Sequence, residues 1–209
     1  MSEISVRRAT PSDRRRVAEI HAAAFPDYFL THLGPSFLQR YYEAFLREPH
    51  TVVIGSVDGR PAGFVAGTTD LARFRRDLYT PNLLRFPAIV AGKIVVDPVV
   101  RRHVFARLHH VRLAVSSLLH RGDRSAPEQG AETTSYLFSI CVDPATQGTG
   151  MADAVMAGYI EAERTRGARR IRLSVFDDNA RAIRFYERGG WKVSDREGNS
   201  VLYELELND

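Results

Sequence analysis

The chain has 209 residues, of which 44% are hydrophobic and 26% charged, a composition typical of one soluble globular domain that spans residues 1–209. The single cysteine, Cys141, excludes a disulfide framework and a cysteine-rich metal site, and the absence of a leader-like start or an apolar run of about 20 residues predicts a cytoplasmic protein without a membrane span. The formal net charge is +4, but residues 70–124 hold eleven Lys and Arg against four Asp and Glu.

The first third of the chain predicts a strand, two helices and a hairpin. Residues 4–9 alternate apolar and polar side chains as a half-buried strand does. A helix follows from Thr10-Pro11, with His21 on its apolar stripe, and ends near residue 25 because Pro26 disfavours helix in the residue before it. Gly34-Pro35 opens a short second helix. Residues 51–57 and 61–69 are the strands of a hairpin, since a hairpin signal, Asp58-Gly59, separates them.

Residues 70–133 differ in character and predict further helices. Helix starts are expected at Thr80-Pro81 and at Asp97-Pro98, and the second helix carries an apolar stripe from Val100 to Leu118 opposite a basic face. The polar stretch 121–133 predicts a loop. The basic charge suggests a region that faces phosphate, nucleotide, a membrane surface or an acidic partner, or a solvated face. Without a recognition-helix signature or interleaved aromatic residues, we expect no nucleic acid partner.

The last third of the chain alternates strands and helices. A buried strand is expected at 135–142 and a helix at 148–166, with Met151, Val155 and Ala162 facing inward. A strand at 170–176 and a helix at 179–188 follow, and Gly189-Gly190 ends that helix. Residues 191–193 and 200–207 form a closing pair of strands.

The order of strand, glycine-rich turn and helix around Gly148 and Gly150 predicts an anion site. Free amide groups at a helix N-terminus and the helix dipole attract phosphate, and a side chain on either glycine would block its approach. The three-glycine spacing of a dinucleotide fingerprint and the Gly-Lys-Ser/Thr of a P-loop are both absent.

A different pattern fits. Residues 147–152, QGTGMA, match Q/R-x-x-G-x-G/A after the strand LFSICVDP, and NARAIRFYERGGWKV follows about thirty residues later. The chain therefore resembles the GNAT superfamily of acetyl-CoA-dependent N-acetyltransferases, most strongly over residues 137–193. The resemblance implies an α/β fold with a mixed, mostly antiparallel central sheet flanked by helices. Residues 70–133 would form a helical insertion between the third and fourth strands.

The resemblance also implies residue roles and acetyl-CoA as the acetyl donor. In the family the fourth and fifth strands splay apart beside the acetyl and pantetheine end of the cofactor, and the following turn cradles the pyrophosphate. The positions that match the family's cofactor-binding residues are Ile140, Cys141, Val142, Gln147, Gly148, Thr149, Gly150, Met151, Ala152 and Asn179. Tyr186 matches the tyrosine that protonates the leaving thiolate, or it is a core aromatic residue. A phenol keeps its proton at neutral pH and can donate it.

The resemblance supplies no general base. The expected fourth strand has no acid, and Ser174 stands on the fifth strand where some relatives carry glutamate. A water chain or a histidine from elsewhere could serve. His32 is one candidate, and with Asp27 and Tyr28 it falls in the region that lines the acceptor pocket of relatives. Cys141 is interpreted as a buried structural thiol, because no activating partner lies near it in sequence.

The acceptor is expected to be a small-molecule primary amine that attacks the thioester directly in a ternary complex. The basic insertion favours an anionic acceptor, such as a nucleotide-linked amino sugar or another biosynthetic intermediate. A protein N-terminus or lysine, or a non-catalytic acyl-CoA sensor, are the alternatives. A homodimer is left open, and no metal is expected.

Overall fold

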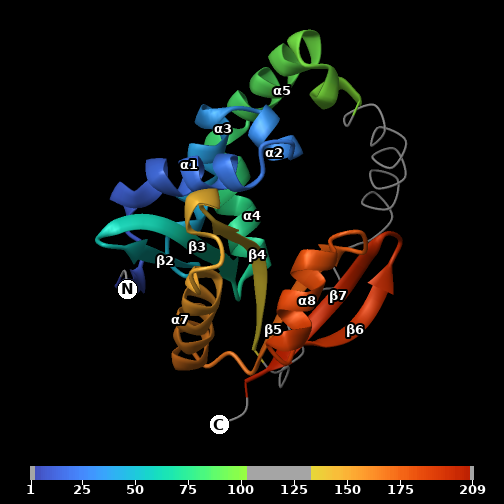
Figure 1. Cartoon of the computed structure of the whole chain (residues 1–209). Coiled ribbons are helices and arrows are strands. Elements are labelled where there is room, and N and C mark those ends of the chain that lie inside the picture. Colours follow the sequence, from blue (N-terminus) through green and yellow to red (C-terminus); the bar gives the residue numbers. More distant parts are fainter. Residues whose placement is uncertain (1–2, 103–132, 208–209) are drawn as a thin grey trace.

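The computed structural model describes residues 3–102 and 133–207, and its centre is a seven-stranded sheet in the order β1-β2-β3-β4-β5-β7-β6 (Figure 1). Every neighbouring pair is antiparallel except β4 and β5, which run parallel. The predicted mixed, mostly antiparallel sheet flanked by helices is confirmed. Among the described residues, no helix has both the length and the apolar character needed to cross a membrane.

The first three strands form an antiparallel meander. They are β1 (Ile4–Arg8), β2 (Thr51–Val57) and β3 (Arg60–Thr68). The predicted hairpin turn is present, with positive φ angles at Asp58 (49°) and Gly59 (77°), as a tight hairpin turn requires. Side chains of β2 alternate between two cores, because Val52 and Ile54 face one cluster and Val53 faces the other.

Helices from the first half of the chain cover one face of this meander. They are the 3-10 helix η1 (Pro11–Asp13), α1 (Arg14–Ala24), α2 (Phe29–His32) and α3 (Pro35–Phe45). The helix predicted from Thr10-Pro11 and the one from Gly34-Pro35 are both present, and the short α2 between them was not predicted. Phe37, Leu38, Tyr42 and Phe45 of α3 are buried against α1 and the sheet.

Between β3 and β4 the chain forms α4 (Leu71–Tyr79), the 3-10 helix η2 (Thr80–Asn82) and α5 (Arg85–Val96) (Figure 1). The prediction of a helix start at Thr80-Pro81 was wrong in detail, because Pro81 lies in η2 and the next α-helix begins at Arg85. Residues 98–102 are helical, as predicted from Asp97-Pro98. The rest of that predicted helix, with its apolar stripe, and the predicted loop apart from residue 133 lie outside the described residues.

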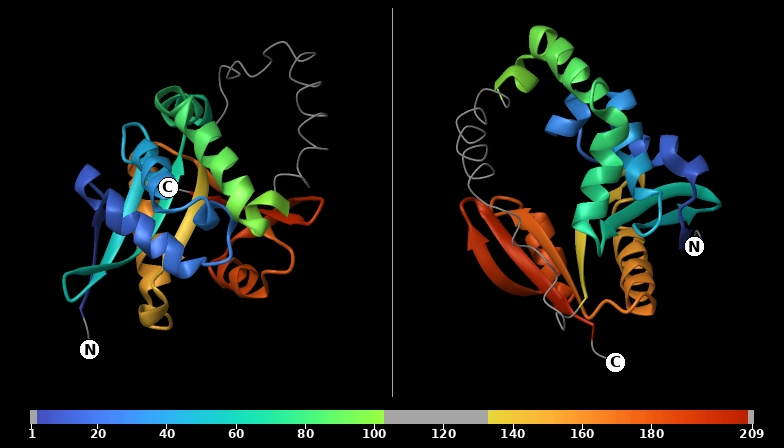
Figure 2. Two further views of the ribbon diagram at one scale, coloured as in Figure 1. Left: turned by 90° about the horizontal axis from the view of Figure 1, so that it is seen from above. Right: turned by 180° about the vertical axis from the view of Figure 1, so that it is seen from behind.

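The opposite face of the sheet carries α7 (Met151–Thr165) and α8 (Ala180–Arg188) (Figure 2). Glycines in the strands let α7 approach closely. A Cβ at Gly55 would lie 2.4 Å from Met151 Sδ, and one at Gly63 would lie 2.7 Å from Met151 Cγ. The fully buried Met151 therefore fills the space that two strand glycines leave open.

The second half of the sheet is built from β4 (Thr134–Val142), β5 (Arg170–Phe176), β6 (Lys192–Glu197) and β7 (Ser200–Glu206). Gly190, with a φ angle of 80°, follows α8 as the predicted stop signal, and β6 extends further than the predicted strand 191–193. The prediction that 135–142 is a buried strand was wrong in part, since Phe138 is 43% exposed and four other residues of β4 after Ser135 are only partly buried. These residues are not fully buried because β4 separates from β5 after Tyr136.

Candidate active site

β4 and β5 separate after a short paired stretch. Their parallel pairing joins Thr134, Ser135 and Tyr136 to Arg170, Ile171 and Arg172, and it does not continue toward Val142 or Phe176. A β-bulge at Phe138 accompanies the separation, because the register between β3 and β4 shifts there. The two strands therefore form a V whose open end exposes backbone and side chains of both.

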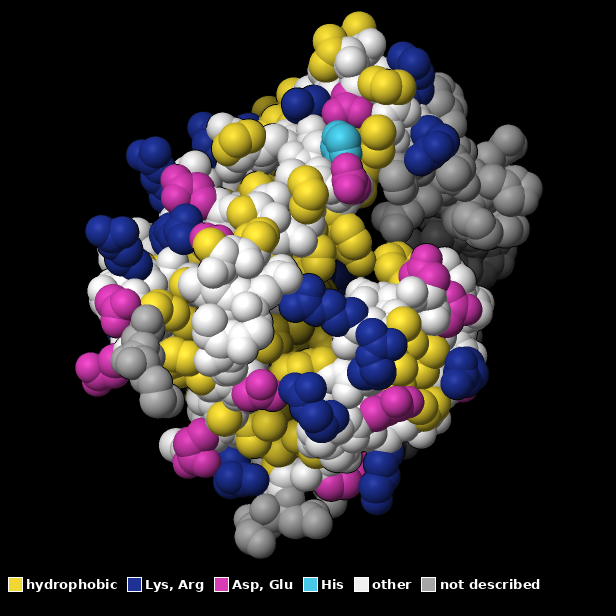
Figure 3. All heavy atoms as spheres, viewed as in Figure 1, with side chains coloured by type: hydrophobic (Ala, Val, Ile, Leu, Met, Phe, Trp, Pro, Cys, Tyr) yellow, Lys and Arg dark blue, Asp and Glu magenta, His cyan; other side chains and the backbone are white. Residues whose placement is uncertain are grey.

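A cavity of about 680 Å³ occupies this opening, and the space-filling view shows a hollow bordered by basic side chains in the middle of the corresponding face (Figure 3). Three groups of residues line it. β4, β5 and the first residue of β7 contribute Leu137, Phe138, Ser139, Ile140, Val142, Leu173, Ser174, Val175, Phe176 and Ser200. The loop before α7, the start of α7, and α8 contribute Thr146, Gln147, Gly148, Gly150, Met151, Ala152, Asp153, Asn179, Arg181, Ala182, Arg184, Phe185, Tyr186 and Arg188. The third group, which we call the helical wall, is His21, Ala24, Phe25, Tyr28, Leu30 and Tyr41.

The glycine loop has the backbone that an anion site needs. Gly148 and Gly150 have φ angles of 80° and 89°, a left-handed conformation that favours glycine, and no heavy atom lies within 4 Å of a Cβ built on either one. α7 begins at Met151, so the prediction that this helix starts at Gly148 was wrong: both glycines belong to the loop. The first amides of α7 have no acceptor within the helix and lie beside the cavity. Phosphate groups fit this open, positively polarised loop.

Two arginines of α8 contact the loop and the first turn of α7. Arg181 Nη1 donates to Gln147 Oε1 at 2.7 Å, and Arg188 forms an ion pair with Asp153 at 3.0 Å. Asn179 lines the cavity and also caps α8, because its Oδ1 accepts the Ala182 N–H at 3.1 Å. The two arginines were not singled out from the sequence, although their spacing on one helix is a signal that could have found them.

Two of the predicted cofactor-binding residues do not line the cavity with the others. Cys141 is 1% exposed, and its Sγ lies 3.8 Å from His21 Nδ1 on the face toward α1. Burial raises the pKa of the Cys141 thiol, which supports its interpretation as a structural residue. Thr149 instead bonds to the loop itself, with its hydroxyl donating to the Thr146 carbonyl at 2.7 Å.

Tyr186 lies on α8 at the edge of the cavity and is 5% exposed. Its ring contacts Trp191 and Tyr203, with centroids 5.5 and 5.8 Å away. Burial raises the pKa of its phenol, so the hydroxyl keeps its proton at neutral pH. The structure confirms that Tyr186 is a core aromatic residue, and because it also lines the cavity, its role as the acid stays a prediction.

Of the three residues predicted to bind the acceptor, only Tyr28 lines the cavity. Tyr28 lies in the helical wall, where its ring contacts Phe25 at 5.1 Å and Phe176 at 6.4 Å. Asp27 is exposed and does not line the cavity. His32 does not line it either, because its Nδ1 lies 2.9 Å from Asp97 Oδ2 at the end of α5. Proximity in sequence to Tyr28 was therefore not enough to place Asp27 and His32.

The residues that sequence reasoning missed are His21 and its neighbours. His21 was expected only as part of the apolar stripe of its helix, yet it lines the cavity while 3% exposed. Its Nδ1 lies 2.6 Å from the hydroxyl of the buried Tyr42, which donates to Ser139 Oγ at 3.2 Å. The signal was a histidine on an apolar helix face, and only the tertiary structure shows that this face meets a cavity.

Charge is distributed unevenly around the cavity. Among the described residues, its charged lining residues are Asp153, Arg181, Arg184 and Arg188, all on α7 or α8. The Lys and Arg residues of the basic region that the structure describes do not line it. The loop side of the cavity is therefore positive, whereas the helical wall is uncharged and largely aromatic.

The sequence model of the acetyltransferase (GNAT) family matches residues 14–191, which is most of the chain. The chain belongs to this family. The match includes the glycine loop, the splayed strands and Tyr186.

Individual relatives match over shorter stretches. The chain is 32% identical to an uncharacterised N-acetyltransferase of Mycobacterium tuberculosis over 103 residues, 49% of this chain and 60% of that protein. It is 39% identical to an L-amino acid N-acetyltransferase of Escherichia coli over 69 residues, 32% of this chain and 41% of that protein. The matches thus span less than two thirds of either relative. An acetyltransferase structure from Salmonella typhimurium, which contains acetyl-CoA, covers 99% of this chain and 95% of its own, with 15% identity and a TM-score of 0.58, and so shares the fold.

Proposed function

We propose that this chain is an acetyl-CoA-dependent N-acetyltransferase that acetylates the primary amine of a small molecule by direct attack in a ternary complex. The observation that carries the proposal is the cavity, because it brings the glycine loop, the separated strands and Tyr186 to one place. The family match and the residues of the loop both fit acetyl-CoA.

Each part of the cavity has a chemical role in this proposal. Acetyl-CoA supplies an activated acetyl carbonyl when it is bound. The amides at the start of α7 and the arginines of α8 would hold its phosphates, since both are donors on the positive side of the cavity. The open edge of β4 near Ile140 and Val142 offers backbone groups to the acyl end. Tyr186 would give its proton to the leaving sulfur.

The helical wall indicates the class of acceptor. Phe25, Tyr28 and Tyr41 offer aromatic surface, and the wall has no charged side chain. An amine with an apolar or aromatic body fits such a surface better than a phosphorylated one, because a buried phosphate needs a cation or several donors. The anionic acceptor expected from the sequence depended on the basic residues of the 70–133 region reaching the cavity, and those that the structure describes do not line it.

Calorimetric titration with acetyl-CoA, run beside a free-thiol assay of CoA release, tests the proposal. The amine panel contains aromatic and aliphatic L-amino acids, the corresponding arylalkylamines, phosphorylated amino sugars and short peptides. We expect micromolar binding of acetyl-CoA and turnover with an apolar or aromatic amine.

Each outcome has a distinct meaning. Turnover restricted to phosphorylated amino sugars would overturn the acceptor class but keep the enzyme. Turnover restricted to peptides would favour a protein N-terminus as acceptor. Binding without turnover of any amine would favour an acyl-CoA sensor, and absence of binding would overturn the proposed function.

A further inference from the structure

His21 is a buried base candidate in the wall of the cavity. It is 3% exposed, it lines the cavity, and its Nε2 has no hydrogen-bond partner among the described residues. Buried polar atoms in proteins nearly always have a partner, so an unpaired one on a residue that lines a cavity points to a ligand. On the other side of the ring, Nδ1 is held by Tyr42 at 2.6 Å.

The hydrogen bonds around the ring decide which nitrogen carries the proton. With the single Tyr42 proton donated to Ser139 Oγ at 3.2 Å, the 2.6 Å contact between Tyr42 and His21 is satisfied when Nδ1 carries the ring proton, and we assign the tautomer on this basis. Burial lowers the pKa of His21 to about 4, so the ring is neutral above that pH and has one N–H. Nε2 therefore holds a free lone pair, which is the form that accepts a proton.

We propose that His21 is the general base of this site, accepting on Nε2 the proton that the acceptor amine loses during attack, while Tyr42 and Ser139 fix the tautomer of the ring. The inference rests on the proposed function. It supplies the base that the sequence did not provide, because Asp153 is the only carboxylate among the described lining residues and it pairs with Arg188.

The proton and electron balance of the step is complete. The amine enters this step as the neutral free base, having lost its first proton to solvent. Its nitrogen lone pair forms the C–N bond, and the C–S bond breaks with its electrons leaving on sulfur. The nitrogen proton passes to His21 Nε2, and the Tyr186 proton passes to sulfur. A weak base suffices because the nitrogen becomes strongly acidic as the C–N bond forms. Return of a proton from His21 to Tyr186 through solvent restores both residues.

The surroundings of His21 favour this role over a covalent one. The titratable groups that face the ring are Tyr42 from α3 and Cys141 from β4, and burial raises the pKa of both, so both are neutral at pH 7. Cys141 does not line the cavity and cannot reach an acyl group there as the nucleophile. No ion pair with His21 exists among the described residues, so no negative charge would offset the positive charge of a protonated ring.

The variant His21→Asn tests the base directly. An asparagine amide can replace the Nδ1 donor to Tyr42 but has no nitrogen that accepts a proton. With the amine identified by the panel above, we expect kcat/KM to fall about 100-fold or more. The Kd for acetyl-CoA should change less than threefold, because His21 lies in the helical wall and not in the loop.

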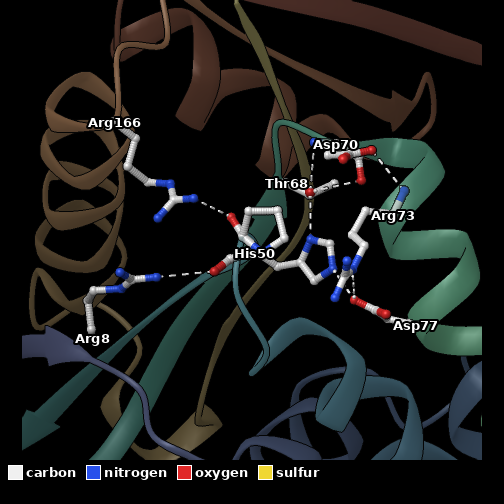
Figure 4. Close-up of polar contacts among 8 residues, drawn as sticks. Arg8, His50, Thr68, Asp70, Arg73, Asp77 and Arg166 are labelled. Carbon is white, nitrogen blue, oxygen red and sulfur yellow. Dashed lines mark hydrogen bonds and ion pairs between the residues drawn. The ribbon is translucent and has the colours of Figure 1, made fainter.

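His50 provides a matched control (Figure 4). It is also buried, at 1% exposed, but both of its nitrogens have partners: Nδ1 lies 2.7 Å from Thr68 Oγ1 and Nε2 lies 3.3 Å from Asp77 Oδ2. It lies outside the cavity of the site. The variant His50→Asn should keep wild-type kcat/KM at a temperature where it is folded, even if its melting temperature falls.

A second measurement does not depend on turnover. Nitrogen-15 NMR of the imidazole, assigned by comparison with His21→Asn, should show protonated Nδ1 and bare Nε2 from pH 8 down to about pH 5. In the variant Tyr42→Phe the ring proton should occupy both Nδ1 and Nε2, because the hydroxyl that accepts the Nδ1 proton is removed. We also expect kcat of this variant to fall about tenfold.

The results distinguish failure of the His21 inference from failure of the proposed function. Turnover by His21→Asn within threefold of wild type, or a proton resident on Nε2 in the wild-type protein, overturns the inference while the proposed function stands. Failure of the wild-type protein to turn over any amine overturns the proposed function and the role of His21 with it.

Discussion

Tyr186 is a packed aromatic residue as well as the proposed acid. Its ring packs against Trp191 and Tyr203, and the residue lines the cavity. Burial raises the pKa of the phenol, so the hydroxyl is protonated at neutral pH and has a proton to donate. The sequence identifies Tyr186 through its motif, and the packing shows that burial raises its pKa further above the ordinary value of a phenol.

The variant Tyr186→Phe keeps the ring and removes the acid. We expect kcat to fall about 100-fold, since general acid catalysis contributes roughly that much or more, with little change in the Kd for acetyl-CoA. Steady-state CoA release and calorimetry measure the two quantities. Tyr79→Phe, at an exposed position on α4, is the control. Unchanged kcat in Tyr186→Phe would show that another group protonates the sulfur.

Asp13 is a residue whose importance lies in stability. Its carboxylate receives two 2.8 Å bonds from Arg7 and one of 2.7 Å from the Thr10 N–H, joining β1 to the start of α1. The Arg7 guanidinium lowers the pKa of Asp13 to about 2 in the folded protein. This stabilisation is complete above the unfolded pKa near 4 and is lost as pH falls through about 2.

We therefore expect Asp13→Asn to lower the free energy of unfolding by about 2 kcal/mol at pH 7, and the difference from wild type to shrink between about pH 4 and pH 2. Urea unfolding followed by circular dichroism at several pH values measures it. Glu161→Gln, which removes a 68% exposed carboxylate, should change stability by less than about 0.5 kcal/mol. A pH-independent effect of Asp13→Asn would contradict the assigned cause.

Among the elements, the loop before α7 combines a local and a tertiary requirement. The sequence predicted an anion-binding turn from its two glycines, and their left-handed φ angles agree with that prediction. The exact start of α7 could not be read from the sequence, because glycine is compatible with both the loop and a helix terminus.

Replacing Gly150 by valine tests the loop. A β-branched side chain is strained at a φ angle of 89° and would point into the space that phosphate needs, so we expect acetyl-CoA to bind at least tenfold more weakly by calorimetry. Gly167→Val is the matched control, since Gly167 follows α7 with a φ angle of 82° and equally open surroundings. Equal loss of affinity in both variants would assign the effect to general strain.

At the scale of the whole molecule, the cavity lies between two parts that share few strand contacts. β4 belongs to the meander with β1, β2 and β3, while β5 pairs with β7, and the two parts pair directly at three positions. Residues that line the cavity come from both parts. A ligand that contacts the glycine loop and α8 would therefore add contacts across the opening.

Acetyl-CoA should accordingly stabilise the whole chain. At 100 times its Kd, the expected gain is about 2.7 kcal/mol, or a rise in melting temperature of roughly 5 to 10 °C. Differential scanning fluorimetry with and without acetyl-CoA measures the shift, and Gly150→Val at the same concentration should show a smaller one. A wild-type melting temperature that does not respond to saturating acetyl-CoA would contradict this placement of the site.

The sequence by itself determined the order of most elements, the glycine loop, the family and the candidate acid Tyr186, because these depend on local periodicity, turn chemistry and short motifs. Only the tertiary structure placed Phe138 in a bulge, moved Cys141 and His32 away from the cavity, and brought His21 to its wall. Those positions depend on where β4 separates from β5 and on which face of α1 lines the cavity. Neither is encoded in neighbouring residues, since contacts between α1, α3 and β4 join segments about 20 to 120 positions apart.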